Sequence, residues 1–213
     1  MIKGQTIGWC VMAILLAGGC ERAPDRPTAV LEEREEPGET VIVEHEALGP
    51  AVTYAIAPES DFSFTGYYVG GSQTGGFLIF DGQWVMQGES PETAEAEIFF
   101  FTDSVHSTDE RLTRTLVGEN FFDAMNHPEA LFTSSRIQRE QDDTYRITGD
   151  LQLRGVDKTL SFPARIWLED EAVRVQAEFQ VDRTWWDLGR GGIGDYALRD
   201  RVDLAIDLTA QPE

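Results

Sequence analysis

Apolar and polar residues alternate with a period of two along three segments of the C-terminal half, 145–154, 173–182 and 202–209. Successive side chains of a β-strand point to opposite faces, so each segment is predicted to be an antiparallel strand with one buried face. Six more segments have strand character, at 52–57, 61–68, 76–87, 95–103, 130–138 and 159–168. Eight or nine strands with little helix predict an all-β barrel or sandwich.

The region between residues 107 and 128 breaks this alternation. Residues 107–110 (STDE) have the pattern of a capping box, and residues 111–125 then predict one or two short helices interrupted near Gly118. Pro128 ends the run. A helical insert between strands can cover the mouth of a barrel or simply connect two strands, and the sequence leaves both roles open.

The N-terminus has the features of a bacterial export signal. Lys3 precedes an apolar run over 7–17, which has the length of a signal-peptide core and is shorter than the roughly 20 residues of a membrane span. Small residues then lead directly to Cys20, a pattern that resembles the lipobox of bacterial lipoproteins. We therefore expect a signal peptide over 1–19 and a lipid anchor on Cys20. The alternative is an ordinary secretory signal followed by a chance cysteine.

The residue after Cys20 bears on the location of the chain. In enteric bacteria an Asp at this position favours the inner membrane, whereas this chain has Glu21. We therefore expect the periplasmic side of the outer membrane, with the inner membrane as the second choice. The other cysteine, Cys10, lies within the expected signal, so no internal disulfide or cysteine metal site is expected in the mature chain.

Residues 20–50 differ in composition from the rest of the chain. They are rich in Glu and Pro and contain no aromatic residue. Such a segment cannot bury enough apolar surface to offset the entropy lost on ordering, so it is predicted to be an acidic tether. Residues 51–211 then make one domain, of a size that supports its own core.

The chain carries a formal net charge of -21, which limits its partners. Nucleic acids are excluded, because binding them requires a basic surface that replaces the counterions of the phosphates. Broad adhesion to anionic headgroups is disfavoured for the same reason. The charge favours a well-solvated surface.

The sequence contains no recognisable catalytic or metal-binding pattern. His45, His106 and His127 are far apart and lack the spacing of a zinc site. The glycine-rich stretch 70–76 is neither a nucleotide-phosphate loop nor a nucleophile turn, and is predicted to be a flexible hairpin connection. Because no nucleophile and base can be paired, we expect no enzymatic activity, no cofactor and no metal.

Four ordered blocks resemble the YceI-like lipid- and polyisoprenoid-binding family. The blocks are Asp103-Ser104-Val105 with Thr108; Asn120-Phe121-Phe122-Asp123-Ala124 with Pro128, Phe132 and Ser134; 145–163, with its Ile147-Thr148-Gly149-Asp150-Leu151 centre and its Phe162-Pro163 end; and Asp182-Arg183 with Trp186, Asp200 and Val202. Each block is weak alone, but their order from about Tyr54 to Ala210 is specific. One departure is Asp187, where the family often has Gly.

The resemblance implies a lipocalin-like antiparallel β-barrel of about eight strands with a short helical insert. It also implies a polyisoprenoid or similar long-chain lipid inside, and a barrel of this size has room for one small ligand. Candidates for the lining are aromatic residues, each of which can instead belong to an ordinary core: Phe64, Phe80, Trp84, Phe132, Phe162, Phe179 and Trp186.

Two further expectations concern the rim. Phe121 and Phe122 are expected to anchor the insert, and Arg183 is expected to be a buried partner of Asp200 that orients the last two strands. The main alternative to lipid binding is a structural or interaction protein whose barrel is filled by its own side chains. An enzyme that acts on a lipid is a third interpretation, and the oligomeric state stays open.

Overall fold

The computed structural model describes residues 25–33, 49–189 and 198–213. The expected signal peptide over 1–19 and the expected lipid anchor, Cys20, lie outside the described residues. Most of the expected tether over 20–50 also lies outside them. The fold below therefore concerns the barrel and one short piece of the segment that precedes it.

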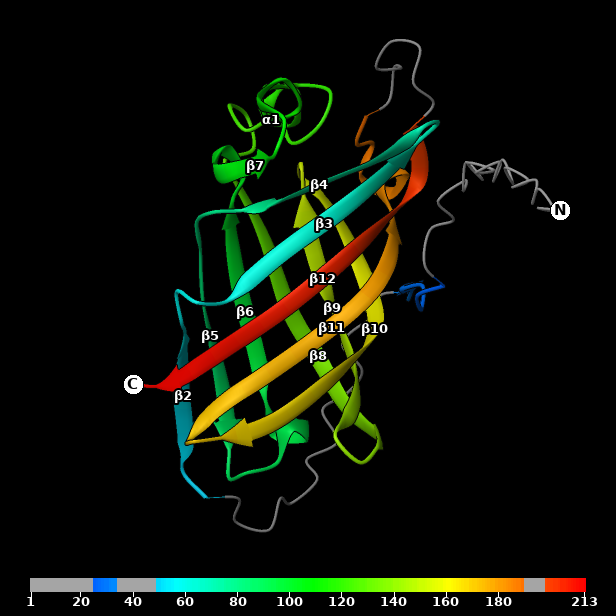
Figure 1. Cartoon of the computed structure of the whole chain (residues 1–213). Helices are drawn as coiled ribbons and strands as arrows, with labels where there is room; N and C mark the ends of the chain where they lie inside the picture. Colours follow the sequence, from blue (N-terminus) through cyan, green and yellow to red (C-terminus); the bar gives the residue numbers. More distant parts are fainter. Residues whose placement is uncertain (1–24, 34–48, 190–197) are drawn as a thin grey trace, which may run out of the picture.

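Eight strands close into an antiparallel barrel (Figure 1). Around the ring they are β2 (Ala51–Ile56), β5 (Phe80–Gln87), β6 (Glu95–Phe101), β8 (Glu129–Gln141), β9 (Thr144–Leu153), β10 (Val156–Glu169), β11 (Ala172–Asp182) and β12 (Leu198–Pro212). The ring closes because β12 pairs with β11 on one side and with β2 on the other. The predicted barrel of about eight antiparallel strands is confirmed.

One end of the barrel carries all the remaining large elements. There β3 (Asp61–Tyr68) pairs with β12, β4 (Gly71–Phe77) with β3, and β7 (Val105–Ser107) with β4, as Figure 1 shows. The helix α1 (Glu110–Val117) lies beyond β7, so we call this the helix end and the opposite one the far end. The described residues also include three short 3-10 helices: η1 (Pro91–Thr93), η2 (Thr102–Ser104) and η3 (Arg183–Trp186).

Two details of the strand prediction were wrong. The segment 76–87 is divided between β4 and β5, and the glycine-rich stretch expected to be a flexible connection is the strand β4. The reason lies in its packing against β3, where Gly75 pairs directly with Phe64. A Cβ atom on Gly75 would lie 2.6 Å from Cζ of Phe64. Gly75 thus makes room for an aromatic ring, a role that composition alone does not distinguish from flexibility.

The helix begins and ends close to its predicted limits, with a different cap. The carboxylate of Asp109 accepts hydrogen bonds from the backbone N–H groups of Arg111 (2.7 Å) and Leu112 (3.4 Å). The predicted cap at Ser107 is wrong because Ser107 belongs to β7, where it pairs with Gly75. No second helix forms after Gly118, since residues 118–127 consist of turns and bends. Within the described residues, no helix has the length and apolar character needed to cross a bilayer.

Part of the expected tether belongs to the barrel wall. The short strand β1 (Val30–Leu31, blue in Figure 1) pairs antiparallel with β10, where Val30 faces Ser161. Ala29, next to it, exposes 3% of its surface. The composition of 20–50 predicted no ordered structure, but it cannot reveal that β10 offers unpaired backbone groups. Pairing with these groups orders the segment although it buries little apolar surface.

Candidate functional site

The far half of the barrel interior is filled by large side chains. Trp84, Met86, Tyr145, Ile166 and Leu208 point inward from four strands, and each exposes 2% or less of its surface. Such close packing leaves little space between the side chains. These residues form a floor that closes the barrel at its far end.

Toward the helix end, several inward-facing side chains are only partly covered. Leu204 pairs with Phe64, and Phe132 pairs with Leu151, yet all four are half-buried. Ile206, two residues along from Leu204, is half-buried as well. An inward-facing apolar side chain keeps accessible surface only where the interior beside it is not filled. These five residues are therefore less completely covered than the floor, and we call the part of the interior beside them the hollow.

Three of the predicted lining residues lie in this half-covered region. Phe64 and Phe132 line the hollow directly. Phe80 is also half-buried, and its ring lies edge-on to the ring of Phe62, with 4.9 Å between the centroids. The structure therefore brings Phe64, Phe80 and Phe132 to the inner wall of one half of the barrel.

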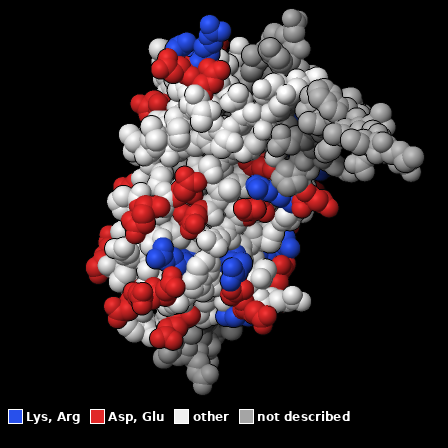
Figure 2. Space-filling view, viewed as in Figure 1, with Lys and Arg blue, Asp and Glu red and all other residues white. Residues whose placement is uncertain are grey.

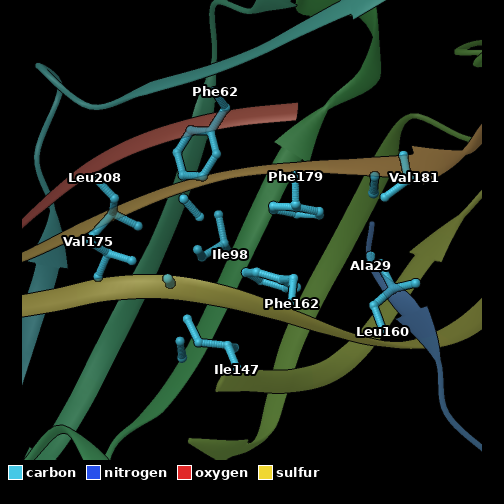
Figure 3. Packing of buried hydrophobic residues seen from close by; sticks show 14 of the residues in the cluster. Ala29, Phe62, Ile98, Ile147, Leu160, Phe162, Val175, Phe179, Val181 and Leu208 are labelled. Atoms are coloured by element: carbon cyan, nitrogen blue, oxygen red, sulfur yellow. The ribbon is translucent and has the colours of Figure 1, made fainter. Parts of the chain in front are cut away.

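The other four predicted lining residues are almost completely buried. Trp84 belongs to the floor. Phe162 and Phe179 stack on each other with their centroids 4.2 Å apart and their planes 11° from parallel (Figure 3). Trp186 exposes 1% of its surface in η3, where its Nε1 donates to the backbone oxygen of Leu151 at 3.3 Å. These four residues therefore belong to the packed core around the hollow.

The candidates chosen from the sequence leave out three aliphatic residues of the lining, Leu151, Leu204 and Ile206. The candidates were chosen among aromatic residues, because these have the largest apolar surface. The alternation over 202–209 already placed Leu204 and Ile206 on the same face of one strand. The signal that identifies them is therefore the periodicity of the strand rather than the size of the side chain.

The insert covers the helix end of the barrel. Phe121 and Phe122 expose 6% and 7% of their surfaces, so the prediction that they anchor the insert is confirmed. The ring of Phe122 lies 5.3 Å from that of Phe77 and 6.3 Å from that of Phe64. Because Phe64 lines the hollow, Phe122 of the insert packs against the lining. The insert is therefore more than a connection between strands.

Two arginines hold the surrounding loops. Arg154 donates to the backbone oxygens of Glu119 and Asp187, each at 3.0 Å, and so links the β9–β10 turn to the insert and to η3. Arg183 donates to the carboxylate of Asp200 at 3.1 Å, which confirms the predicted pair, and to the backbone oxygens of Leu188, Leu198 and Arg199. Asp187 has a φ of 57°, a left-handed conformation that favours glycine.

The titratable groups offer little chemistry near the hollow. Among the described residues, no group of three or more His, Cys, Asp and Glu side chains is placed to hold a metal ion. His106 lies in β7, and Nε2 of His127 is 4.0 Å from a carboxylate oxygen of Asp123. Burial raises the pKa of Tyr145, which belongs to the floor. The lining of the hollow can therefore exclude water from an apolar molecule, but it supplies no charged contact.

The outer surface is mainly acidic. Figure 2 shows acidic side chains spread over the barrel wall, with fewer basic ones among them, as the net charge of -21 requires. On the face shown, charged groups thus lie on the outer surface of the barrel.

Comparison with known proteins supports this architecture. The crystal structure of Burkholderia cenocepacia BcnA superposes with a TM-score of 0.67 at 22% identity, over 72% of this chain and 97% of that one. The polyisoprenoid binding domain from Saccharophagus degradans superposes with a TM-score of 0.63 at 14% identity, over 77% of this chain and all of that one (100%). At these identities the similarity establishes the fold alone.

Sequence comparison adds curated relatives and a family. A UPF0312 protein of Pectobacterium atrosepticum is 32% identical over 112 residues, which are 52% of this chain and 58% of that protein. Protein YceI of Escherichia coli is 29% identical over 120 residues, 54% of this chain and 62% of that protein, so each match covers less than two thirds of the relative. The YceI-like domain matches residues 54–210, which is nearly the whole barrel. The chain therefore belongs to the YceI-like domain family.

Proposed function

We propose that this protein binds one polyisoprenoid or similar long-chain lipid in the apolar hollow. The observation that carries the proposal is the half-covered state of paired inward-facing residues, Leu204 with Phe64 and Phe132 with Leu151. Apolar surface inside a protein is normally covered, so accessible surface at these positions favours the binding of an apolar molecule. The polyisoprenoid binding domain from Saccharophagus degradans, which shares the fold, supports this class of ligand.

Burial of the lipid chain supplies the binding free energy. Several hundred Å² of apolar surface, at roughly 25 cal/mol per Å², give a gross gain of about 10–20 kcal/mol before the costs of association and ordering. This gain requires no charged contact, consistent with the purely apolar lining. The floor of Trp84, Met86 and Tyr145 fills the far half of the barrel, so it limits how much of the chain can enter.

Native mass spectrometry of protein purified without detergent tests the proposal. We expect a bound mass in the isoprenoid range, or uptake of one added polyprenol molecule per chain. A protein that stays free of lipid, even after polyprenol is added, would favour the alternative in which side chains fill the barrel. The packed floor is the observation that supports this alternative for the far half.

The proposal includes an anchor in the bacterial cell envelope. Lipidation of Cys20 would hold the chain to a membrane, with the periplasmic side of the outer membrane as the proposed location. Asp25 is the first described residue of the segment that packs on the barrel. The five peptide units between Cys20 and Asp25 span at most about 18 Å, so the barrel would lie close to the bilayer surface.

The anchor has its own test. The mass of the mature chain, isolated from membranes, is expected to include fatty acids attached through residue 20, and a Cys20→Ala variant is expected to lose them. A variant that kept its fatty acids would show that the acyl chains are attached elsewhere. A wild-type chain without fatty acids would contradict the anchor but leave lipid binding in the barrel unaffected.

A further inference from the structure

The wall of the barrel is not continuous between β10 and β11. The two strands pair directly from Glu169 and Ala172 at the far end to Arg165 and Gln176. Nearer the helix end, the segment 25–33 lies between them. Its strand β1 pairs with β10, and Thr28 forms a parallel bridge with Gln180 of β11.

Backbone hydrogen bonds join this segment to both neighbours. On the β11 side, Ala29 N donates to Gln180 O and Gln180 N donates to Pro27 O, both at 2.8 Å. On the β10 side, Glu32 N donates to Thr159 O at 3.0 Å. The segment 25–33 thus serves as an additional strand that completes the wall, and we call it the inserted strand.

The side chains of the inserted strand hold it weakly. Ala29 exposes 3% of its surface and packs among core residues (Figure 3), whereas Val30 and Leu31 expose 54% and 40%. Arg26 lies 3.4 Å from a carboxylate oxygen of Glu178 and 3.7 Å from one of Asp203. Only one methyl group is therefore fully buried, and the ion pair with Glu178 is largely solvated.

The buried acid beside the inserted strand also has partners on other strands. Asp203 exposes 2% of its surface and also accepts hydrogen bonds from the hydroxyl of Tyr67 at 2.7 Å and from Nε2 of Gln180 at 2.8 Å. These neutral donors remain on β3 and β11 when the inserted strand leaves. Its departure therefore removes the ion pair with Arg26 but leaves the Asp203 carboxylate with two hydrogen bonds.

The helix end is closed much more firmly. Phe121, Phe122 and Trp186 are buried there, and the guanidinium groups of Arg154 and Arg183 bind backbone oxygens of the surrounding loops. Local opening occurs where few apolar contacts are lost. The seam between β10 and β11 is therefore easier to open than the covered mouth.

An apolar path leads from the seam to the hollow. Phe162 of β10 and Phe179 of β11 stack across the seam beneath the inserted strand. The ring of Phe132, which lines the hollow, lies 5.9 Å from that of Phe162, and Leu204 pairs directly with Phe179. A lipid chain that passes the stacked pair reaches two residues of the lining.

From these contacts we infer that the inserted strand, residues 25–33, is a displaceable closure of a side slot between β10 and β11, through which the lipid chain enters and leaves the hollow. The inference rests on the proposed lipid binding. It also couples that binding to the N-terminus, because the inserted strand follows directly on the segment that begins at Cys20.

A disulfide across the slot tests this inference. Val30 and Ser161 are cross-strand partners, so Val30→Cys with Ser161→Cys places two thiols in a geometry that suits a disulfide. The control is Arg165→Cys with Gln176→Cys, a partner pair of the same two barrel strands below the slot. Both pairs are made in the mature chain from residue 20 with Cys20→Ser, so that no other thiol interferes.

The measurement is the rate at which a dansyl-labelled C20 isoprenol passes from the loaded protein to phosphatidylcholine vesicles. Oxidation of the Val30/Ser161 pair is expected to slow transfer on the order of tenfold or more, because opening would require breaking the disulfide, and reduction is expected to restore it. The control pair is expected to transfer at the same rate in both redox states. Equal rates for the oxidised and reduced Val30/Ser161 pair would overturn the side slot while leaving lipid binding intact.

If the protein does not bind lipid at all, the result is different: no variant takes up the probe, and the inference fails together with the proposed function.

Hydrogen exchange of the unmodified protein tests the opening without any ligand. The amides of Ala29 and Gln180 are expected to exchange faster than those of the Arg165–Gln176 pairing region, through local opening. Exchange of Ala29 and Gln180 only at the rate of global unfolding would overturn the inference.

Discussion

The ring of Phe132 lies against the backbone of Gly149. A Cβ atom built on Gly149 would come 2.6 Å from Cζ of Phe132 and 2.5 Å from the backbone oxygen of Thr133. Gly149 belongs to the block that resembles the YceI-like family, and Phe132 lines the apolar hollow. The glycine therefore leaves room for the aromatic ring against the inner wall.

Gly149→Ala is expected to destabilise the barrel by about 2 kcal/mol, because the new methyl group overlaps both the ring and a backbone oxygen. Gly66→Ala is the matched control. Gly66 also lies in a strand, but its Cβ would meet nothing closer than 3.7 Å, at Cδ1 of Leu198. Urea unfolding measures both variants, and equal effects on the free energy of unfolding would show that the contact with Phe132 is not the cause.

Arg183 is expected to stabilise the fold mainly through backbone oxygens, not through its acidic partner. The side chain of Arg183 is 10% exposed and binds three backbone oxygens, whereas the side chain of Asp200 is 65% exposed. Arg183→Lys is expected to cost about 2–4 kcal/mol, since the buried oxygens lose their donors. Asp200→Asn is expected to cost about 0.5 kcal/mol or less, as for other exposed ion pairs. Thermal unfolding of both variants checks this, and a larger cost for Asp200→Asn would reverse the assignment.

At the far end of the barrel, the pKa of Asp143 depends on its pair with Arg165. A hydrogen bond from Arg165 lowers the pKa of Asp143 below its ordinary value. A lowered pKa stabilises the folded state above the unfolded value of about 3.9, and this contribution disappears as the pH falls through the folded value. Arg165→Gln is expected to raise the pKa of Asp143 toward the ordinary value, measured by NMR titration of its carboxyl carbon. An unchanged pKa would mean that another group holds it low.

The barrel could be predicted from the sequence because strand periodicity is a local property. The alternation over 145–154, 173–182 and 202–209 corresponds to strands with one inward face, as β9, β11 and β12 show. The glycines of β4 could not be assigned in this way. The role of Gly75, for example, depends on Phe64 in the neighbouring strand, and a single segment does not contain that contact.

The candidate site could be predicted only in part. Aromatic size led to Phe64 and Phe132, which are half-buried in the structure, but it did not distinguish them from Phe162 and Phe179, which stack on each other. Whether an inward-facing residue is covered depends on the side chains opposite it across the barrel. The inserted strand was missed for a related reason, because its order comes from the backbone of β10 and β11 and not from its own composition.

The central claim is that the half-covered space beside Leu204 is where the lipid binds. Leu204→Trp is expected to fill that space with the protein's own side chain. Ala205→Trp is the matched control, since Ala205 is the next residue of β12 and its side chain points to the outer face.

Native mass spectrometry after incubation with polyprenol measures the outcome directly. We predict one bound lipid for the wild-type protein and for Ala205→Trp, and none for a folded Leu204→Trp protein. A Leu204→Trp protein that binds one polyprenol as well as the wild type would contradict the account, because the lipid would then bind elsewhere.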